Sequence, residues 1–258
     1  DSKYFIIEGD EYDTAFFDKR SKFVHYEPNT LVINNIEFDH SDIFENINQI
    51  KKQFHYLIRT MSSKTNIVYK ENDKNVQSLL DMGCWSKIIT FKKFDAALNI
   101  FGDHNLENCG AAISAAETIG INVESSLNAL KKFTGVKRRL ELVKIDKFIL
   151  YDDFAHHPTA VKATINAVKQ KHPGLSINIF FEIRSNSMVA GTHKDYFLES
   201  FDGVNRVYVY SSKKIKWLKP TNKIKIFDNI DTVAKEIISS TENVDIVILM
   251  SNGDTSHI

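Results

Sequence analysis

The stretch KFILYDDFAHHPTAVKATINAVKQK, residues 147–171, contains the units that decide the fold. Its apolar start, residues 147–151, is typical of a buried strand, and the spacing of apolar residues over 159–171 predicts a helix. Pro158 suits the first turn of that helix and places His157 at its N-cap. Because ligands bind beyond the carboxyl ends of strands in open α/β sheets, the polar residues between strand and helix predict a site.

Alternating strand and helix patterns continue on both sides of this stretch, which is typical of an α/β fold with a doubly wound, mostly parallel sheet. The helical pattern ends near Thr134-Gly135-Val136, before the basic Lys137-Arg138-Arg139, so we expect two domains, residues 1–136 and residues 137–258. The expected strands are residues 4–8, 31–36, 66–69, 88–91, 147–151, 176–181, 206–210, 224–227 and 245–250. The expected helices are residues 41–61, with Ser41 or Asp42 as cap, 76–82, the alanine-rich half of 101–120, 123–133, 159–171, 194–201 and 232–239.

The bulk composition predicts an ordinary globular protein. With 258 residues and 43% hydrophobic content, the chain can fill one large or two medium cores. Its 33 basic and 33 acidic residues balance, which gives no general attraction to nucleic acid or to an anionic membrane. No apolar run approaches the roughly 20 residues of a membrane helix, and the start carries no signal-peptide pattern. We expect a cytoplasmic protein without nucleic-acid or membrane partners.

Acidic side chains gather after two of the expected strands. Such hard oxygen ligands suit Mg²⁺ held beside phosphates, although a solvated acidic loop explains either group better when it is taken alone. Two groups at parallel strand ends make a metal more credible than one. The first group is Glu8, Asp10, Glu11 and Asp13; the second is Asn34, Asn35, Glu37, Asp39, His40 and Asp42.

Three further polar groups could bind a ligand. Asn105 and Asn108, which follow Asp103-His104, are three residues apart on an expected helix, so their amides could face a planar base; helix capping is the simpler alternative. The basic run 137–139 suits phosphates, although such runs are usually only solvated. Residues 184–187, RSNS, form either a carboxylate clamp or a polar turn.

The composition of residues 151–161 leaves several roles open. Asp152, Asp153, His156 and His157 could be metal ligands, general acid-base groups or nucleotide contacts. Neither the dinucleotide fingerprint nor the phosphate loop G-x-x-x-x-G-K-[ST] occurs in the sequence. The chain therefore cannot cradle a triphosphate with a phosphate loop of its own.

Five ordered motifs resemble the central and C-terminal domains of the Mur ligase family. RSNSM at residues 184–188 and EYDTAFFDKRSKFVHY at residues 11–26 are most similar to the branch that handles a murein tripeptide. The resemblance implies part of a P-loop-type ATPase central domain followed by a Rossmann-like C-terminal domain. The motifs are GDEYDTAFFDKRSKF (9–23), NNIEFDHSDIF (34–44), GDHNLENCGAA (102–112), GVKRRLE (135–141) and YDDFAHHPTAV (151–161).

The resemblance also implies an activity. Enzymes of this kind use ATP and Mg²⁺ to convert the muramate carboxylate into an acyl phosphate, which the amino group of the incoming peptide attacks. The implied product joins L-Ala-γ-D-Glu-meso-diaminopimelate to UDP-N-acetylmuramate in peptidoglycan recycling. One alternative is the branch that adds L-alanine alone. Others are a metal-dependent hydrolase built from Glu8, His40, Asp152 and His156, and a non-catalytic remnant that binds nucleotide or peptide.

The family motifs carry roles over to individual residues. Glu8 matches the glutamate that binds Mg²⁺, and His40 matches the histidine that holds a second metal near the carboxylate being activated. Arg139 matches an arginine that reaches the phosphates. His104, Asn105 and Asn108 match the adenine side, and Asp153 matches the ribose contact. His156 and His157 fall where the C-terminal domain faces the reacting groups, and Arg184, Ser185 and Asn186 where the distal end of the peptide is bound.

The sequence departs from the family pattern in three places. The UDP-binding region and the phosphate loop would precede Asp1, residues between Phe91 and Gly102 are fewer than in relatives, and the chain stops at SNGDTSHI. We therefore expect an N-terminal half that is either encoded separately or deleted, and we expect this fragment to be inactive alone. The loss of phosphate-loop donors would remove several kcal/mol of transition-state stabilisation, roughly as for a lost oxyanion donor.

Overall fold

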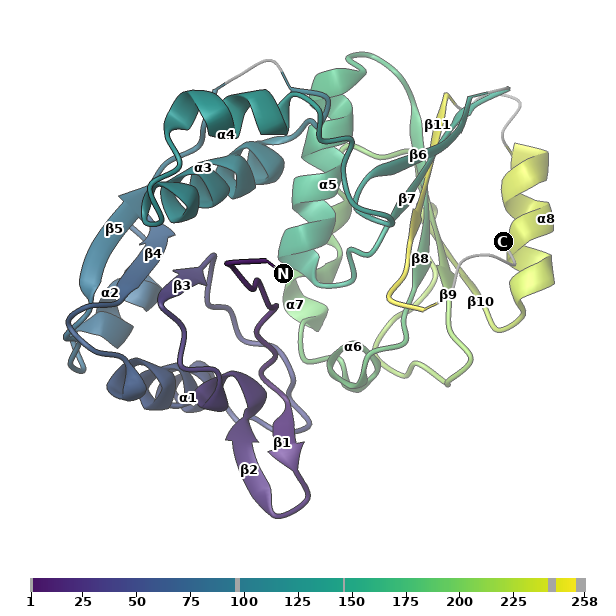
Figure 1. Cartoon of the computed structure of the whole chain (residues 1–258). Coiled ribbons are helices and arrows are strands. Elements are labelled where there is room, and N and C mark those ends of the chain that lie inside the picture. Colours follow the sequence, from purple (N-terminus) through teal and green to yellow (C-terminus); the bar gives the residue numbers. More distant parts are fainter. Residues whose placement is uncertain (1, 96–97, 146, 241–244, 254–258) are drawn as a thin grey trace. The chain divides into compact units, whose positions relative to one another are not determined.

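The computed structural model describes residues 2–95, 98–145, 147–240 and 245–253, and it divides into two compact units (Figure 1). The first unit comprises Asp1–Asp95 and Glu107–Leu130, and the second comprises Ala96–Leu106 and Lys131–Ile258. Both units combine helices with parallel strands, so the predicted α/β class is confirmed. The domain boundary was expected after residue 136, but this position lies inside the second unit, which includes Lys131–Ile258. Within the described residues, no helix has the length and apolarity needed to span a membrane.

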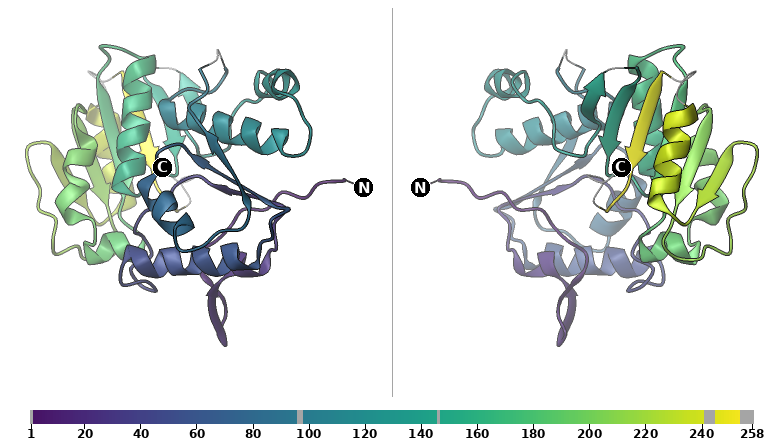
Figure 2. Two further views of the ribbon diagram at one scale, coloured as in Figure 1. Left: turned by 90° about the vertical axis from the view of Figure 1, so that its left-hand side faces the viewer. Right: turned by 90° about the vertical axis from the view of Figure 1, so that its right-hand side faces the viewer.

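The first unit is built on a three-stranded parallel sheet with the order β3-β4-β5. Ile67 and Tyr69 face α1 and α2, whereas Val68 faces α3, so alternate residues of β4 contribute to two cores. The β1-β2 hairpin projects from this unit (Figure 2). The elements are β1 (Asp13–Ala15), β2 (Asp18–Ser21), η1 (Lys22–His25), β3 (Thr30–Ile33), α1 (Ile47–Thr60), β4 (Asn66–Lys70), α2 (Lys74–Leu80), β5 (Lys87–Phe91), α3 (Asp103–Glu117, shared with the second unit) and α4 (Val123–Leu130).

Two predictions for the first unit are wrong. Residues 4–8 form no strand, and Phe5 and Ile6 are 86% and 95% exposed, because no described strand pairs with them and no core covers them. Helix α1 begins at Ile47 and not near Ser41, because the side chain of Asn46 accepts hydrogen bonds from the first free amides of the helix. The residues before Asn46 form turns instead of helix.

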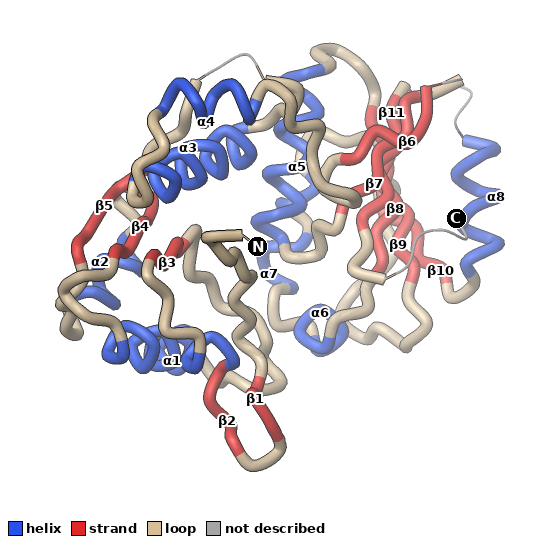
Figure 3. The backbone as a smooth tube through the Cα atoms, viewed as in Figure 1, coloured by secondary structure: helices blue, strands red, loops and turns tan. Residues whose placement is uncertain are grey.

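The second unit contains a six-stranded sheet with the order β10-β9-β8-β11-β7-β6, in which only the edge strand β6 is antiparallel. Helix α5 covers one face of this sheet and α8 covers the other (Figure 3). The elements are β6 (Glu141–Ile145), β7 (Ile149–Asp153), α5 (Pro158–Lys171), β8 (Ile177–Glu182), α6 (Asn186–Ala190), α7 (Lys194–Phe197), η2 (Glu199–Phe201), β9 (Arg206–Tyr210), β10 (Ile224–Phe227), α8 (Ile230–Ser240) and β11 (Ile246–Met250).

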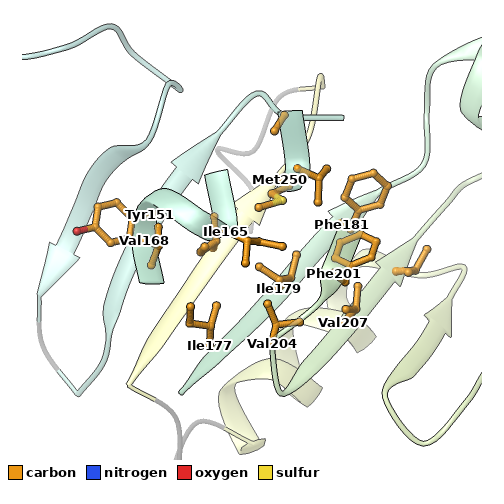
Figure 4. Packing of buried hydrophobic residues seen from close by; sticks show 14 of the residues in the cluster. Tyr151, Ile165, Val168, Ile177, Ile179, Phe181, Phe201, Val204, Val207 and Met250 are labelled. Atoms are coloured by element: carbon orange, nitrogen blue, oxygen red, sulfur yellow. The ribbon is translucent and has the colours of Figure 1, made fainter. Parts of the chain in front are cut away.

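The core under α5 fixes this sheet in place. Ile179 and Phe181 of β8 lie against Ile165 of α5 and Phe201, and all four side chains are buried (Figure 4). Burying an aliphatic or aromatic side chain contributes about 1.5–3 kcal/mol, so this layer is a main source of stability for the unit. As predicted, His157 caps α5 and Pro158 occupies its first turn.

The partly buried side chain of His172 makes the stability of this unit depend on pH. The hydroxyl of Tyr151 lies 2.9 Å from Nε2 of His172, and burial together with Lys171 lowers the pKa of His172. The folded state therefore binds the proton less readily than the unfolded chain, whose histidine pKa is about 6.5. The stability contributed by neutral His172 is present above that value and is lost as the pH falls through it.

We expect His172→Gln to reduce the difference between the melting temperatures measured at pH 7.5 and pH 5.5, because glutamine keeps a hydrogen-bonding group without the titration. His55→Gln, on helix α1 of the other unit, is the matched control. Equal pH dependence in the wild type and His172→Gln would contradict the assignment.

Candidate functional site

Polar side chains gather where the parallel strands of the second unit end. Asp152 and Asp153 close β7, Glu182 closes β8, and residues 251–253 follow β11, which pairs with both strands. Because parallel strands deliver their carboxyl ends to one edge, these groups share the edge at which ligands bind in such sheets. Glu182 and residues 251–253 were missed in the sequence, where their position directly after strands was the available signal.

Asp153 is 4% exposed and holds two loops of this edge together. Its Oδ2 accepts a hydrogen bond from Leu140 N at 2.7 Å, and its Oδ1 accepts from Ala155 N at 2.7 Å and Thr164 Oγ1 at 3.3 Å. Burial raises the pKa of this carboxyl, and the three donors counteract the rise. Both carboxylate oxygens thus accept hydrogen bonds that stabilise the fold. The ribose contact expected for Asp153 stays a prediction.

The segment that Asp153 holds begins at Arg138, whose backbone has a φ of 58°. Arg138 Nη2 donates to Ser251 O at 2.6 Å, and its Nε lies 3.4 Å from Asp152 Oδ2. Arg139 is exposed, and its guanidinium lies 5.0 Å from the centre of the Phe154 ring. Arg138 is therefore fixed to β11 and β7, whereas Arg139 presents its charge to solvent, as a phosphate contact requires.

The two histidines of the loop differ in their contacts. His156 donates from Nδ1 to Phe154 O at 3.1 Å, and its ring lies edge-on to Phe154. His157 accepts from Thr159 N with Nδ1, and its ring centre lies 4.4 Å from that of buried His193. No motif singled out His193 in the sequence. The catalytic roles expected for His156 and His157 stay predictions.

The expected peptide contact lies after β8. Arg184 is exposed, and Ser185 caps the short α6 by accepting from Met188 N at 3.4 Å, so Ser185 is partly used by the fold. A Cβ on Gly253 would lie 2.2 Å from Arg184 Nη1 and 2.7 Å from Glu182 Oε2. Glycine at 253 therefore leaves the space in which the Arg184 guanidinium lies. The role of Asn186 stays a prediction.

The start of α3 contains the residues expected beside adenine. Asn105 Nδ2 donates to Phe101 O at 2.9 Å. Asn108 belongs to the first unit, where its Oδ1 accepts from Asn34 Nδ2 at 2.9 Å. The amides of Asn105 and Asn108 thus have separate partners, and their pairing against a base stays a prediction.

In the first unit, His40 contacts Glu11 and Tyr12. His40 Nε2 lies 3.9 Å from Glu11 Oε2, and its ring centre lies 4.5 Å from that of Tyr12. Burial raises the pKa of Glu11. Glu8 is exposed, and no hydrogen bond, ion pair or ring contact joins it to His40. In the ranges that the structure describes, no three His, Cys, Asp or Glu side chains are grouped to hold a metal ion.

Comparison with known proteins places the chain in a family. Residues 138–253 match the family model described as "Mur ligase, glutamate ligase domain". The UDP-N-acetylmuramate--L-alanyl-gamma-D-glutamyl-meso-2,6-diaminoheptandioate ligases of Haemophilus influenzae and Escherichia coli K12 are 36% and 37% identical to it, each over 98% of the chain. The chain belongs to the Mur ligase family.

The crystal structure of a Mur ligase, the murein peptide ligase of Psychrobacter arcticus, has the same fold. It is 32% identical with a TM-score of 0.71, and the match covers 97% of this chain and 60% of that one. The chain spans 63% of the length of the two curated ligases. The resemblance to the Mur ligases inferred from the motifs is thus confirmed.

Proposed function

We propose that this chain forms part of a ligase that uses ATP and Mg²⁺ to join L-Ala-γ-D-Glu-meso-diaminopimelate to UDP-N-acetylmuramate. The observation that carries the proposal is 36% identity over 98% of the chain to the H. influenzae protein whose name states this ligation. The carboxyl edge of the second sheet, with Arg139 and Arg184 exposed on it, supports the proposal because both substrates and the nucleotide are anionic.

Each step of such a ligation needs groups of the kind that the chain carries. ATP would supply a phosphoryl group that turns the muramate carboxylate into a reactive acyl phosphate, and Mg²⁺ would neutralise charge during that transfer. Glu8 and His40 are the proposed metal ligands; the Glu11 carboxylate beside His40 adds an oxygen donor of the type that Mg²⁺ prefers. His104, Asn105, Asn108 and Asp153 are proposed to bind the nucleoside, and Arg139 its phosphates. His156 and His157 are proposed to face the reacting groups.

The test supplies the part of the H. influenzae ligase that the match to this chain leaves uncovered. Residues 1–258 would be fused to that part, and ADP release would be followed with ATP and UDP-N-acetylmuramate. We expect release only when the tripeptide is added. L-alanine in place of the tripeptide is the control that distinguishes the proposed ligase from one that adds L-alanine alone. ADP release with L-alanine but not with the tripeptide would contradict the proposal.

In the same assay, Arg184→Ala is expected to raise the KM for the tripeptide roughly tenfold to a hundredfold, because a charge-assisted hydrogen bond contributes about 1.5–3 kcal/mol. The KM for ATP should stay unchanged. Arg206→Ala, a matched change of an exposed arginine at the opposite end of strand β9, should leave both constants unchanged. An unchanged tripeptide KM in Arg184→Ala would remove Arg184 from the peptide site.

A further inference from the structure

A basic loop follows β9 at the same edge of the sheet as Arg184. Residues 211–225, SSKKIKWLKPTNKIK, contain six lysines and no acidic residue, although the whole chain has a formal charge of zero. Two of these lysines belong to the fold: Lys223 Nζ donates to Phe201 O at 2.7 Å, and Lys225 forms an ion pair with Glu236. The remaining lysines are exposed, and none forms an ion pair with a described residue. They are Lys213, Lys214, Lys216 and Lys219.

The loop is anchored by its apolar residues. Trp217 Nε1 donates to Met188 O at 3.1 Å, and the Trp217 ring lies so close to Gly191 that a Cβ there would be 2.6 Å from it. Leu218 is buried, and Ile215 contacts the same core. The apolar residues turn inward and hold the loop in place. The exposed lysines lie before them (Lys213 and Lys214), between Ile215 and Trp217 (Lys216) and after Leu218 (Lys219).

Hydrogen bonds place the start of this loop beside Arg184. Ser211 Oγ donates to Ile183 O at 2.8 Å, and Ile183 directly precedes Arg184 in the chain. Lys213 N in turn donates to Ser211 Oγ at 3.2 Å. β8 and β9 are parallel neighbours, so the segments after them leave the sheet at one edge. Lys213 and Lys214 therefore extend the positive charge of Arg184 along that edge.

We propose that Lys213 and Lys214 recognise carboxylates of the acidic peptide whose distal end Arg184 binds. This inference rests on the proposed function, because it concerns the same peptide site. The tripeptide keeps the α-carboxylate of its D-glutamyl residue and both carboxylates of diaminopimelate, more than one guanidinium can pair with. Exposed ammonium groups act as mobile point charges, so their contribution is modest and is screened by salt.

Binding of the tripeptide to the chain as it stands tests the inference without any catalysis. Isothermal titration calorimetry would compare the wild type, the double variant Lys213→Gln/Lys214→Gln, and Lys131→Gln/Lys132→Gln, which changes another adjacent pair of exposed lysines. We expect about fivefold weaker binding in the first double variant and a smaller loss of affinity when salt is raised, since two exposed ion pairs contribute about 1 kcal/mol together. The control pair should bind as the wild type does.

A second ligand sharpens the test. A tripeptide with the D-glutamyl α-carboxylate and both diaminopimelate carboxylates amidated should bind the wild type more weakly, and the change of Lys213 and Lys214 should then have no further effect. Equal affinities of the wild type and the double variant for the unmodified peptide would overturn this inference and leave the proposed function untouched. Absence of any peptide binding by the wild-type chain would also overturn it, while the proposed function is decided separately by the ADP-release assay on the fused protein.

Discussion

Replacing Asp153 by alanine is expected to lower the free energy of unfolding of the second unit by about 2 to 4 kcal/mol, because the change leaves buried N–H groups without an acceptor. Leu140 N and Ala155 N both donate to this carboxylate at 2.7 Å. The raised pKa of Asp153 means that burying its charge already costs free energy, so removing the charge offsets part of the loss. The loop that carries Arg138 and Arg139 should loosen first.

Urea unfolding followed by fluorescence measures this effect. The chain has two tryptophans, the exposed Trp85 in the first unit and the partly buried Trp217 in the second. The red shift of the Trp217 emission on unfolding can therefore be compared with circular dichroism. Asp202→Ala, at an exposed aspartate of the same unit, is the control. If Asp153→Ala were as stable as the wild type, the hydrogen bonds would not be the reason for an acid at this position, and ribose binding would become the better explanation.

Gly110→Ala is expected to destabilise the first unit by about 2 kcal/mol, since overpacking against a backbone atom costs about 3 kcal/mol, the upper end of its usual range, and alanine's better helix propensity returns about 1 kcal/mol. A Cβ on Gly110 of α3 would lie 2.0 Å from Lys92 O, a backbone atom that cannot rotate away. The helix would have to move off the end of β5, and the contact between Phe91 and Ala111 would open.

Thermal and urea unfolding monitored by circular dichroism check this prediction. Gly120→Ala is the informative comparison, because Gly120 has a φ of 84° but no heavy atom within 4 Å of an added Cβ. It should cost only the strain of a left-handed residue, about 1–2 kcal/mol. A Gly110→Ala protein more stable than the wild type would show that α3 does not approach the strand end so closely.

The strands with buried residues were predicted more accurately from the sequence than the exposed strand was. Strands β9 and β10 were predicted with the bounds that the structure has, because the β-branched and aromatic residues of RVYVY and IKIF favour strands. Strand β6 was missed because most of it is exposed. The early start predicted for α1 came from Ile43 and Phe44, which continue the helical spacing although their amides bond to His40 O in a turn.

The candidate site was predictable in its place but not in its connections. The strand-loop-helix pattern around residues 147–171 located the edge at which Asp153 and His157 lie. Leu140, whose backbone N–H donates to Asp153, lies thirteen residues away in the sequence. Arg138 and Ser251, whose carbonyl accepts its hydrogen bond, are 113 residues apart in the sequence. Neither contact has a local signal, because each depends on the order in which the strands pair.

The exposed apolar run at residues 4–8 has a consequence for handling the protein. Phe5 and Ile6 lie almost wholly in solvent near one another, as do Phe16 and Phe17 at the tip of the β1-β2 hairpin. With a sequence isoelectric point near 7.3, the molecules barely repel each other in neutral buffer. Colloidal self-association should therefore be greatest around pH 7, and storage about two pH units above it should keep solutions clear for longer.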